Sequence, residues 1–153
     1  SNQRLRAEAA TKFEEMASAM LSEGLKIYAG STYRSYDYQL GLYNRYVAQD
    51  GFAEAEKYSA RAGYSEHQTG LAVDIADLSL DYDNFEKTKE FTWVKHNAHK
   101  YGFILRYPKA KFHITGFKYE PWHYRYVGDI SEYIYKNNLL DIYKEKIKEY
   151  LEK

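Results

Sequence analysis

The stretch Ser65-Glu66-His67-Gln68-Thr69-Gly70-Leu71-Ala72-Val73-Asp74 decides both the fold and the chemistry that we expect of this chain. Bulky and small residues alternate over 71–76, which predicts a strand with one core face and one small-residue face that carries Asp74. Gly70 lets the chain bend, so His67 and Asp74 can meet on one side. A carboxylate flanked by apolar side chains needs a partner once it is buried, either a metal ion or a structural His or Arg.

A second stretch, Tyr119-Glu120-Pro121-Trp122-His123-Tyr124-Arg125, supplies further polar groups. Pro121 stops helix formation, so Glu120 and His123 are expected at a turn that leads into a strand. Alternation then places His123 and Arg125 on one face of that strand. His123 can supply a third ligand with Glu120 beside it, and Arg125 can steady an oxyanion or a buried carboxylate. For this stretch taken by itself, the alternative is a core histidine next to a surface glutamate.

Together the two stretches offer the side chains of a zinc hydrolase. Three protein ligands leave the fourth zinc position to water, and zinc lowers the pKa of that water to roughly 7. A nearby carboxylate can take the proton and later pass it to the leaving amine. The sequence contains no HExxH motif, so we exclude that class of zinc peptidase.

Composition narrows the class of protein further. The 153 residues are expected to form one domain, 1–153, in which Ser1 and Asn2 are a tag remnant because no methionine precedes them. Lys plus Arg and Asp plus Glu both total 22, so no basic surplus is available for phosphates and we expect no nucleic-acid partner. Cysteine is absent, so a metal site must use His, Asp or Glu. No run of eighteen apolar residues is present, so no membrane span is expected in this chain.

The order of helical and strand patterns predicts an α+β fold, a small antiparallel sheet surrounded by helices. Apolar spacing predicts helices over 5–23, 36–50, 84–101 and 139–150. Ser35 is the expected cap of the second helix, and Asp83 with Glu86 forms the expected capping box of the third. The buried stripe of the second helix is expected to be Tyr36, Leu40, Tyr43 and Val47.

Strand patterns cover 25–33, 71–76, 112–118 and 122–127, and 52–70 is predicted as a loop with one helical turn. Three histidines lie outside the two polar stretches. His96 and His99 are three apart on a predicted helix but have no evident acidic partner, so we expect them on the surface. His113 is expected to have a structural role on its strand.

The motifs S-x-H-x-x-G-x-A-x-D and E-P-W-H-x-R resemble those of the VanY-type D-alanyl-D-alanine carboxypeptidases and the related L,D-carboxypeptidases often called LdcB. Both groups have the zinc fold of the lysostaphin, D-Ala-D-Ala peptidase and hedgehog proteins. The resemblance runs from about Tyr33 to Gly128. It departs at Ala62-Gly63-Tyr64, where many relatives read Pro-Gly-His, a change that touches no ligand. It also covers Tyr33-Arg34-Ser35, Gln39, Gly102–Pro108 and Thr115-Gly116.

The resemblance implies roles for individual residues. The implied zinc ligands are His67, Asp74 and His123, with Glu120 as catalytic base. The implied substrate-binding residues are Arg34, Gln39 and Ser65. Arginine suits the terminal carboxylate that a carboxypeptidase must recognise, because it can donate two parallel hydrogen bonds. Trp122 can form the bottom of the substrate cleft or belong to the core. Arg61 and Arg106 are weaker candidates for an anion contact.

We therefore expect a zinc-dependent carboxypeptidase that releases C-terminal D-alanine from peptidoglycan stem peptides. The family resemblance favours L,D activity on tetrapeptides over D,D activity on pentapeptides. The alternatives are a D,D-dipeptidase or endopeptidase of the same fold, and a non-catalytic binding module that keeps zinc for structure. We expect a monomer in the cell envelope, held by an N-terminal signal or anchor outside these residues.

Overall fold

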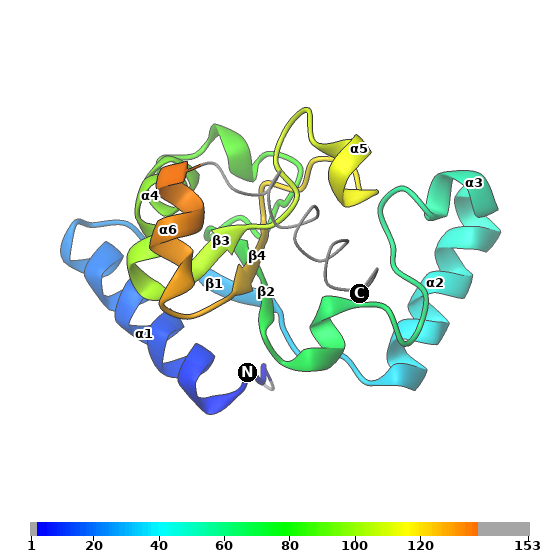
Figure 1. Ribbon diagram of the computed structural model, residues 1–153, viewed down its shortest axis with the longest axis horizontal. Helices are drawn as coiled ribbons and strands as arrows, with labels where there is room; N and C mark the ends of the chain where they lie inside the picture. Colours follow the sequence, from blue (N-terminus) through cyan, green and yellow to red (C-terminus); the bar gives the residue numbers. More distant parts are fainter. Residues whose placement is uncertain (1–2, 138–153) are drawn as a thin grey trace, which may run out of the picture.

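Four short strands form one antiparallel sheet in the order β1-β2-β4-β3 (Figure 1). The computed structural model describes residues 3–137. The two central strands are β2 (Ala72–Ala76) and β4 (His123–Tyr126), and the two edge strands are β1 (Tyr28–Ser31) and β3 (Phe103–Leu105). The predicted α+β class is confirmed, and the central strands are those that carry the polar motifs.

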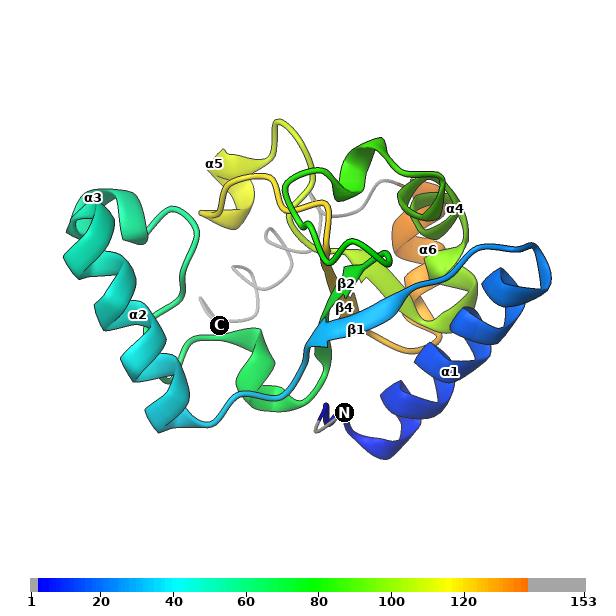
Figure 2. The same cartoon turned by 180° about the vertical axis from the view of Figure 1, so that it is seen from behind.

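One face of the sheet is covered by helices α1 (Ala7–Ser22), α4 (Lys89–Asn97) and α6 (Ile130–Asn137) (Figures 1 and 2). Side chains from α1, from α4 and from alternate strand positions form the main apolar core, because every second residue of a strand points to the same face. The core includes Met16, Val73, Ile75, Phe103 and Tyr124. This packing leaves the opposite face of β2 and β4 for polar side chains.

Helices α2 (Tyr36–Asp50) and α3 (Phe52–Ala55) form an arm on the other side of the molecule (Figure 2). Short α5 (Phe112–Thr115) precedes a segment that meets this arm. The Lys118 backbone N–H donates to the Lys57 carbonyl at 2.7 Å. Lys118 Nζ also lies 3.0 Å from a Glu54 carboxylate oxygen. These contacts join the two sides of the molecule beyond the sheet.

Three turns of 3-10 helix complete the described elements: Glu66–Thr69 before β2, Phe85–Lys87 before α4, and Ala98–Tyr101 after α4. The first ends at Gly70, whose φ of 70° lies in the left-handed region that glycine adopts without strain. This turn feeds directly into β2, so the bend that was predicted at Gly70 is confirmed.

Gly30 creates a bulge in β1 opposite the middle of β2. Ala29 pairs with Ile75, whereas Ser31, two residues later, already pairs with the adjacent Asp74. A bulge of this kind re-aims the following side chain, and here it brings Ser31 opposite Asp74. A Cβ added to Gly30 would lie 1.9 Å from the Tyr82 hydroxyl oxygen, so the tyrosine fills the space that the glycine leaves.

Several local predictions are wrong. The predicted strand 112–118 contains the short helix α5, which Gly116 ends by donating its N–H to the Phe112 carbonyl. The fourth strand is instead β3, whose short apolar sequence shows no alternation. The third helix begins after Thr88, whose side chain accepts from the Phe91 N–H, so the capping box proposed at 83 and 86 does not open it.

The buried face of α2 also differs from the predicted stripe. Ser35 does cap this helix, by accepting from the Tyr38 N–H at 3.2 Å. Tyr36 and Leu40, however, are exposed, and the buried positions are Gln39 and Tyr43. The helix therefore turns a polar side chain inward, toward the site described below. The predicted final helix over 139–150 lies outside the described residues.

Candidate metal centre and cleft

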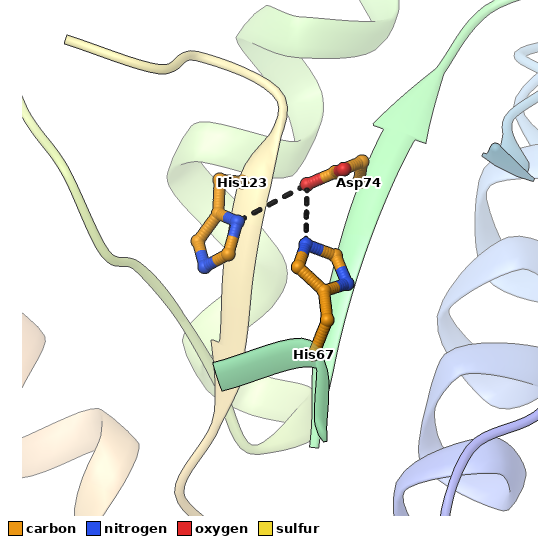
Figure 3. A group of neighbouring side chains, drawn as sticks. All are labelled: His67, Asp74 and His123. Carbon is orange, nitrogen blue, oxygen red and sulfur yellow. Dashed lines mark hydrogen bonds and ion pairs between the residues drawn. The ribbon is translucent and has the colours of Figure 1, made fainter. Parts of the chain in front are cut away.

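Asp74 and His123 are directly paired across the β2–β4 ladder, which places their side chains on the same face. His123 Nδ1 lies 3.1 Å from Asp74 Oδ1, and His67 Nε2 lies 3.2 Å from the same oxygen (Figure 3). Each of the three side chains is buried and offers one donor atom, and these atoms lie within 4.8 Å of one another. The structure therefore brings together the three predicted metal ligands.

The outward nitrogen of each histidine is held by a hydrogen-bond acceptor. His67 Nδ1 lies 2.7 Å from the Thr32 carbonyl oxygen, which can only accept, so Nδ1 carries a proton. His123 Nε2 lies 3.2 Å from a Glu66 carboxylate oxygen. The remaining nitrogens, Nε2 of His67 and Nδ1 of His123, face Asp74. Acceptors placed in this way orient metal-binding imidazoles in proteins.

The donor set fits a zinc ion. Two imidazole nitrogens and one carboxylate oxygen are typical of zinc sites that keep a position open for water or substrate. The site lies at the sheet, where paired strands and a capped turn hold the ligands. The residues that could hold zinc are His67, Asp74 and His123.

Contacts within the group stabilise the ionised forms of Asp74 and His123, whereas His67 is held neutral by burial. Burial opposes ionisation of Asp74, but the charges and hydrogen bonds of His67 and His123 outweigh it and hold the carboxyl pKa well below its usual range. Burial likewise opposes protonation of His123, but its bonds to Asp74 and Glu66 prevail and raise its pKa to about 9. For His67, burial is the largest effect and lowers the pKa. Asp74 thus offers the group an ionised carboxylate as a ligand for a cation.

Glu120 lies beside this group without belonging to it. Its carboxylate oxygen is 3.8 Å from His123 Nδ1, and only 7% of the residue is exposed. Burial raises the pKa of Glu120 to about 7, because removal from water disfavours the charged form. A carboxyl group in this environment can both accept and release a proton near neutral pH.

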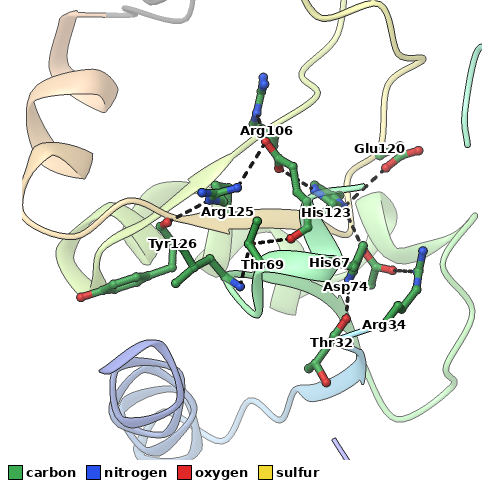
Figure 4. A network of polar contacts seen from close by, with 12 residues as sticks. Thr32, Arg34, His67, Thr69, Asp74, Arg106, Glu120, His123, Arg125 and Tyr126 are labelled. Atoms are coloured by element: carbon green, nitrogen blue, oxygen red, sulfur yellow. Dashed lines mark hydrogen bonds and ion pairs between the residues drawn. The ribbon is translucent and has the colours of Figure 1, made fainter. Parts of the chain in front are cut away.

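Arg34 lies on the opposite side of Asp74 from the histidines (Figure 4). Its Nη2 donates to Asp74 Oδ2 at 3.0 Å, its Nη1 to Gln39 Oε1 at 3.3 Å, and its Nε to Ser31 Oγ at 3.0 Å. A guanidinium has five N–H donors, so these contacts leave one N–H on each terminal nitrogen. The fixed guanidinium lines the cleft next to the metal ligands.

Gln39 helps to hold the Arg34 side chain in place through a hydrogen bond. It is 1% exposed, and its Nε2 donates to the Ala60 carbonyl at 2.7 Å while its Oε1 accepts from Arg34. Both ends of the amide are therefore engaged in the structure. These bonds tie α2 and the Ala60 backbone to the arginine. Gln39 also lines the cleft, and its contact with substrate stays a prediction.

A cleft of about 1120 Å³ opens over the metal centre. Gln39, Ser65 and Trp122 line it, and their contact with substrate stays a prediction. Ser65 precedes the turn that carries His67, and its side chain makes no capping hydrogen bond to that turn. The Trp122 ring lies 5.7 Å from the Tyr82 ring, so these two aromatic residues form one wall.

Arg125 is placed differently from the predicted oxyanion contact. It shares a strand face with His123, but it is not among the described residues that line the cleft. Its Nη1 lies 3.7 Å from a Glu66 carboxylate oxygen, and Arg106 Nε donates to the same oxygen at 2.8 Å. The structure thus favours the other role that the sequence left open, contact with a carboxylate, here the partly buried Glu66.

Sequence reasoning missed Glu66 and the Thr32 carbonyl as partners of the histidines. Burial alone would raise the pKa of Glu66, but its hydrogen bond with His123 and the charge of Arg106 lower the pKa to about 2. Its position directly before His67 was the available signal. A backbone carbonyl such as that of Thr32 leaves no signal in the sequence.

The other histidines lie away from the centre. His96 is exposed, as predicted. His99 is only 9% exposed and stacks on Tyr135 with ring centroids 3.7 Å apart, so its predicted surface position is wrong. His113 is exposed on α5 rather than placed on a strand, which contradicts the predicted setting.

Comparison with known proteins agrees with this fold and site. Residues 2–129 match the VanY family, described as D-alanyl-D-alanine carboxypeptidase. The chain belongs to this family of peptidases. YodJ of Bacillus subtilis is 44% identical over 149 residues, which cover 94% of this chain and 55% of the relative. The chain spans about half the length of two of the curated relatives that it matches.

Solved structures give the same result. The LdcB LD-carboxypeptidase is 45% identical and superposes with a TM-score of 0.86, covering 93% of this chain and 69% of that chain. An E175A mutant of the D,D-pentapeptidase VanY, solved in complex with Zn(II), is 34% identical with a TM-score of 0.82, covering 94% and 85%. The predicted family resemblance and zinc-peptidase fold are confirmed.

Proposed function

We propose that the protein is a zinc carboxypeptidase that removes C-terminal D-alanine from peptidoglycan stem peptides, with tetrapeptides preferred. One observation carries the catalytic part of this proposal. Glu120 stands beside a three-residue donor group, buried and with its pKa raised to about 7, yet outside that group. A zinc site kept only for structure has no need of such a carboxyl group.

The roles of the site residues follow from their geometry. A zinc ion held by His67, Asp74 and His123 supplies Lewis acidity for hydrolysis of the scissile peptide bond. Glu120 takes a proton from the attacking water and delivers it to the leaving amine, and its raised pKa suits both transfers. The Thr32 carbonyl keeps the His67 ring in place throughout.

Arg34 supports recognition of a free chain end. Its two remaining terminal N–H groups form the fork that pairs with a carboxylate. The guanidinium is already fixed by Asp74, Gln39 and Ser31, so little side-chain entropy is lost when substrate binds. A terminal carboxylate bound here lies within reach of the metal centre.

The backbone hydrogen bond between Lys118 and Lys57 supports an exopeptidase rather than an endopeptidase. It links the α3 arm to the segment after α5, and Lys118 also lines the cleft. A cleft bounded in this way suits a peptide that enters by its end. This feature favours the carboxypeptidase over the endopeptidase alternative.

The preference for tetrapeptides is supported by similarity to LdcB, which exceeds similarity to VanY in sequence identity, 45% against 34%. The D,D activity on pentapeptides remains the second candidate, because the matching family is described by that activity. Tyr64, which stands where many relatives have histidine, is 82% exposed and directly precedes Ser65 of the cleft lining, so it is a position where specificity is expected to differ.

Defined muropeptides test the proposal. The zinc-loaded protein is incubated with a stem tetrapeptide ending in D-Ala, a pentapeptide ending in D-Ala-D-Ala, and a crosslinked dimer, and D-alanine release is measured. We expect the highest kcat/KM on the tetrapeptide, and no cleavage inside the crosslink. Preference for the pentapeptide would reverse the specificity, and release of dipeptide or cleavage of the crosslink would overturn the carboxypeptidase assignment.

Location and partners follow from this substrate. The stem peptide lies in the cell wall, so we propose that the protein acts in the cell envelope. We also propose that it acts as a monomer, since one chain supplies the whole donor group. No helix within residues 3–137 is long and apolar enough to cross a membrane.

A further inference from the structure

We propose that Glu66 is a positioning residue, which fixes the His123 ring as a metal ligand while Arg106 and Arg125 fix Glu66. This inference concerns how tightly the site holds zinc and does not depend on which stem peptide is cleaved. Glu66 would act through His123 rather than on substrate.

The two oxygens of Glu66 have separate partners. Oε2 lies 3.2 Å from His123 Nε2, whereas Oε1 accepts from Arg106 Nε at 2.8 Å and lies 3.7 Å from Arg125 Nη1. Only 18% of the Glu66 side chain is exposed, so these contacts compete little with water. One oxygen therefore orients the imidazole while the other is held by two guanidinium groups.

Three elements meet at this carboxylate. Glu66 precedes His67 on the same turn, so a single turn carries one ligand and the partner of another. Arg106 follows β3, and its backbone N–H donates to the His123 carbonyl at 3.1 Å. Arg106 is thus tied to His123 through the backbone and, by way of Glu66, through the side chain. Figure 4 shows Arg106 and Arg125 together on the side of His123 away from Arg34.

The contact selects the ligand atom of His123. An ionised carboxylate can only accept a hydrogen bond, so it keeps a proton on Nε2 and leaves Nδ1 directed at Asp74. Without Glu66 the other tautomer and other ring orientations become accessible, and fewer molecules present Nδ1 to the ion. The corresponding partner of His67 is a backbone carbonyl, so the His123 side is where a side-chain substitution can test the effect.

Zinc affinity, measured by competition with a chromophoric chelator, tests the proposal. We expect Glu66→Ala to bind zinc about 10- to 100-fold more weakly, the usual effect of removing such a partner. Glu66→Gln keeps an acceptor for Nε2–H but loses its charge toward the arginines, so a smaller loss is expected. Glu14→Ala, an exposed position on α1, is the matched control and should bind zinc as the wild type does.

A second readout separates positioning from a general loss of stability. In cobalt-substituted protein, Glu66→Ala and Glu66→Gln should change the visible absorption of the metal, because the imidazole orientation changes. Circular dichroism of the metal-free variants reports whether they fold. A folded Glu66→Ala or Glu66→Gln protein with wild-type zinc affinity and an unchanged cobalt spectrum would overturn the proposal, whether or not D-alanine is released.

Discussion

Asp74 and His123 are register partners on the two central strands, and His123 Nδ1 lies 3.1 Å from Asp74 Oδ1. Two of the three proposed zinc ligands are therefore positioned by backbone hydrogen bonds of the sheet itself. The third, His67, is brought in by the turn that ends at Gly70. A site built on paired strands holds its geometry more closely than one built on loops.

Replacing Asp74 by asparagine should abolish stoichiometric zinc binding. The substitution keeps the size of the side chain but removes the negative charge between His67 and His123. Metal content measured by atomic absorption should fall from about one ion per chain, the occupancy of a single three-ligand site, to near zero. An Asp74→Asn variant that retained a full complement of zinc would show that this carboxylate is not a ligand.

Glu120→Gln should keep the metal and lose the reaction. The amide is close in shape to the carboxylic acid, but it cannot take a proton from water. Removal of a general base typically costs about 10²- to 10⁴-fold in rate, so kcat for D-alanine release should fall by that order with unchanged zinc content. If the variant remained fully active, proton transfer would have to be assigned to another group.

Arg34→Lys tests recognition of the substrate carboxylate. Lysine keeps the charge but lacks the planar fork, and a charge-assisted hydrogen bond contributes about 1.5–3 kcal/mol, which corresponds to a loss of roughly 10- to 150-fold in kcat/KM. The test becomes specific for carboxylate recognition when cleavage of a substrate peptide with a free C-terminal carboxylate is compared with cleavage of the same peptide with a C-terminal amide. The wild type should discriminate strongly against the amide, and the variant should discriminate far less.

For this prediction, zinc content serves as the control, because Arg34 also bonds to Asp74. Equal metal content in variant and wild type assigns the loss to substrate binding. Undiminished discrimination between acid and amide in the lysine variant would place the carboxylate site elsewhere.

Gly30→Ala should destabilise the protein through Tyr82. The new Cβ would lie 1.9 Å from the tyrosine hydroxyl oxygen and 2.9 Å from its ring carbon Cζ, so the ring must move. Overpacking of a core costs about 1–3 kcal/mol, and a loss near the lower end is expected here, because the atoms met are the far end of a partly buried side chain. Thermal unfolding measures the loss. Adding Tyr82→Phe removes the closest atom and should restore part of the loss.

Gly41→Ala is the matched control for Gly30→Ala. Gly41 lies within α2, and a Cβ there would meet nothing within 4 Å. Alanine is the better helix former, so this change should stabilise by about 0.5–1 kcal/mol. Equal unfolding temperatures for the two alanine variants would contradict the steric role of Tyr82.

Strand β2 could be predicted from the sequence because its alternation reflects two different faces. Leu71, Val73 and Ile75 were expected to point toward the core, and Val73 and Ile75 are fully buried in it. Strand β3 could not be predicted in this way, since three consecutive apolar residues have no period. The segment 112–118 shows the opposite error, because its apolar spacing also fits one helical turn ended by a glycine.

The site was predictable in its residues but not in its arrangement. The meeting of Asp74 with His123 depends on strand register, which spacing along the chain does not determine, and the assignment came from resemblance to a family. The alternative of a solvated Gln39 is wrong, because the residue is buried and its amide bonds to Arg34 and the Ala60 carbonyl. Such long-range pairing leaves no local pattern. The same holds for Arg125, whose carboxylate partner lies on a separate turn.

The join between Lys57 and Lys118 acts as a strap across the molecule. For a carboxypeptidase as proposed, a peptide with a free end enters the cleft that Lys118 lines, whereas a strand anchored at both ends is excluded. Under the proposed function, the protein therefore shortens free stem peptides of the cell wall and leaves the crosslinks between its strands intact.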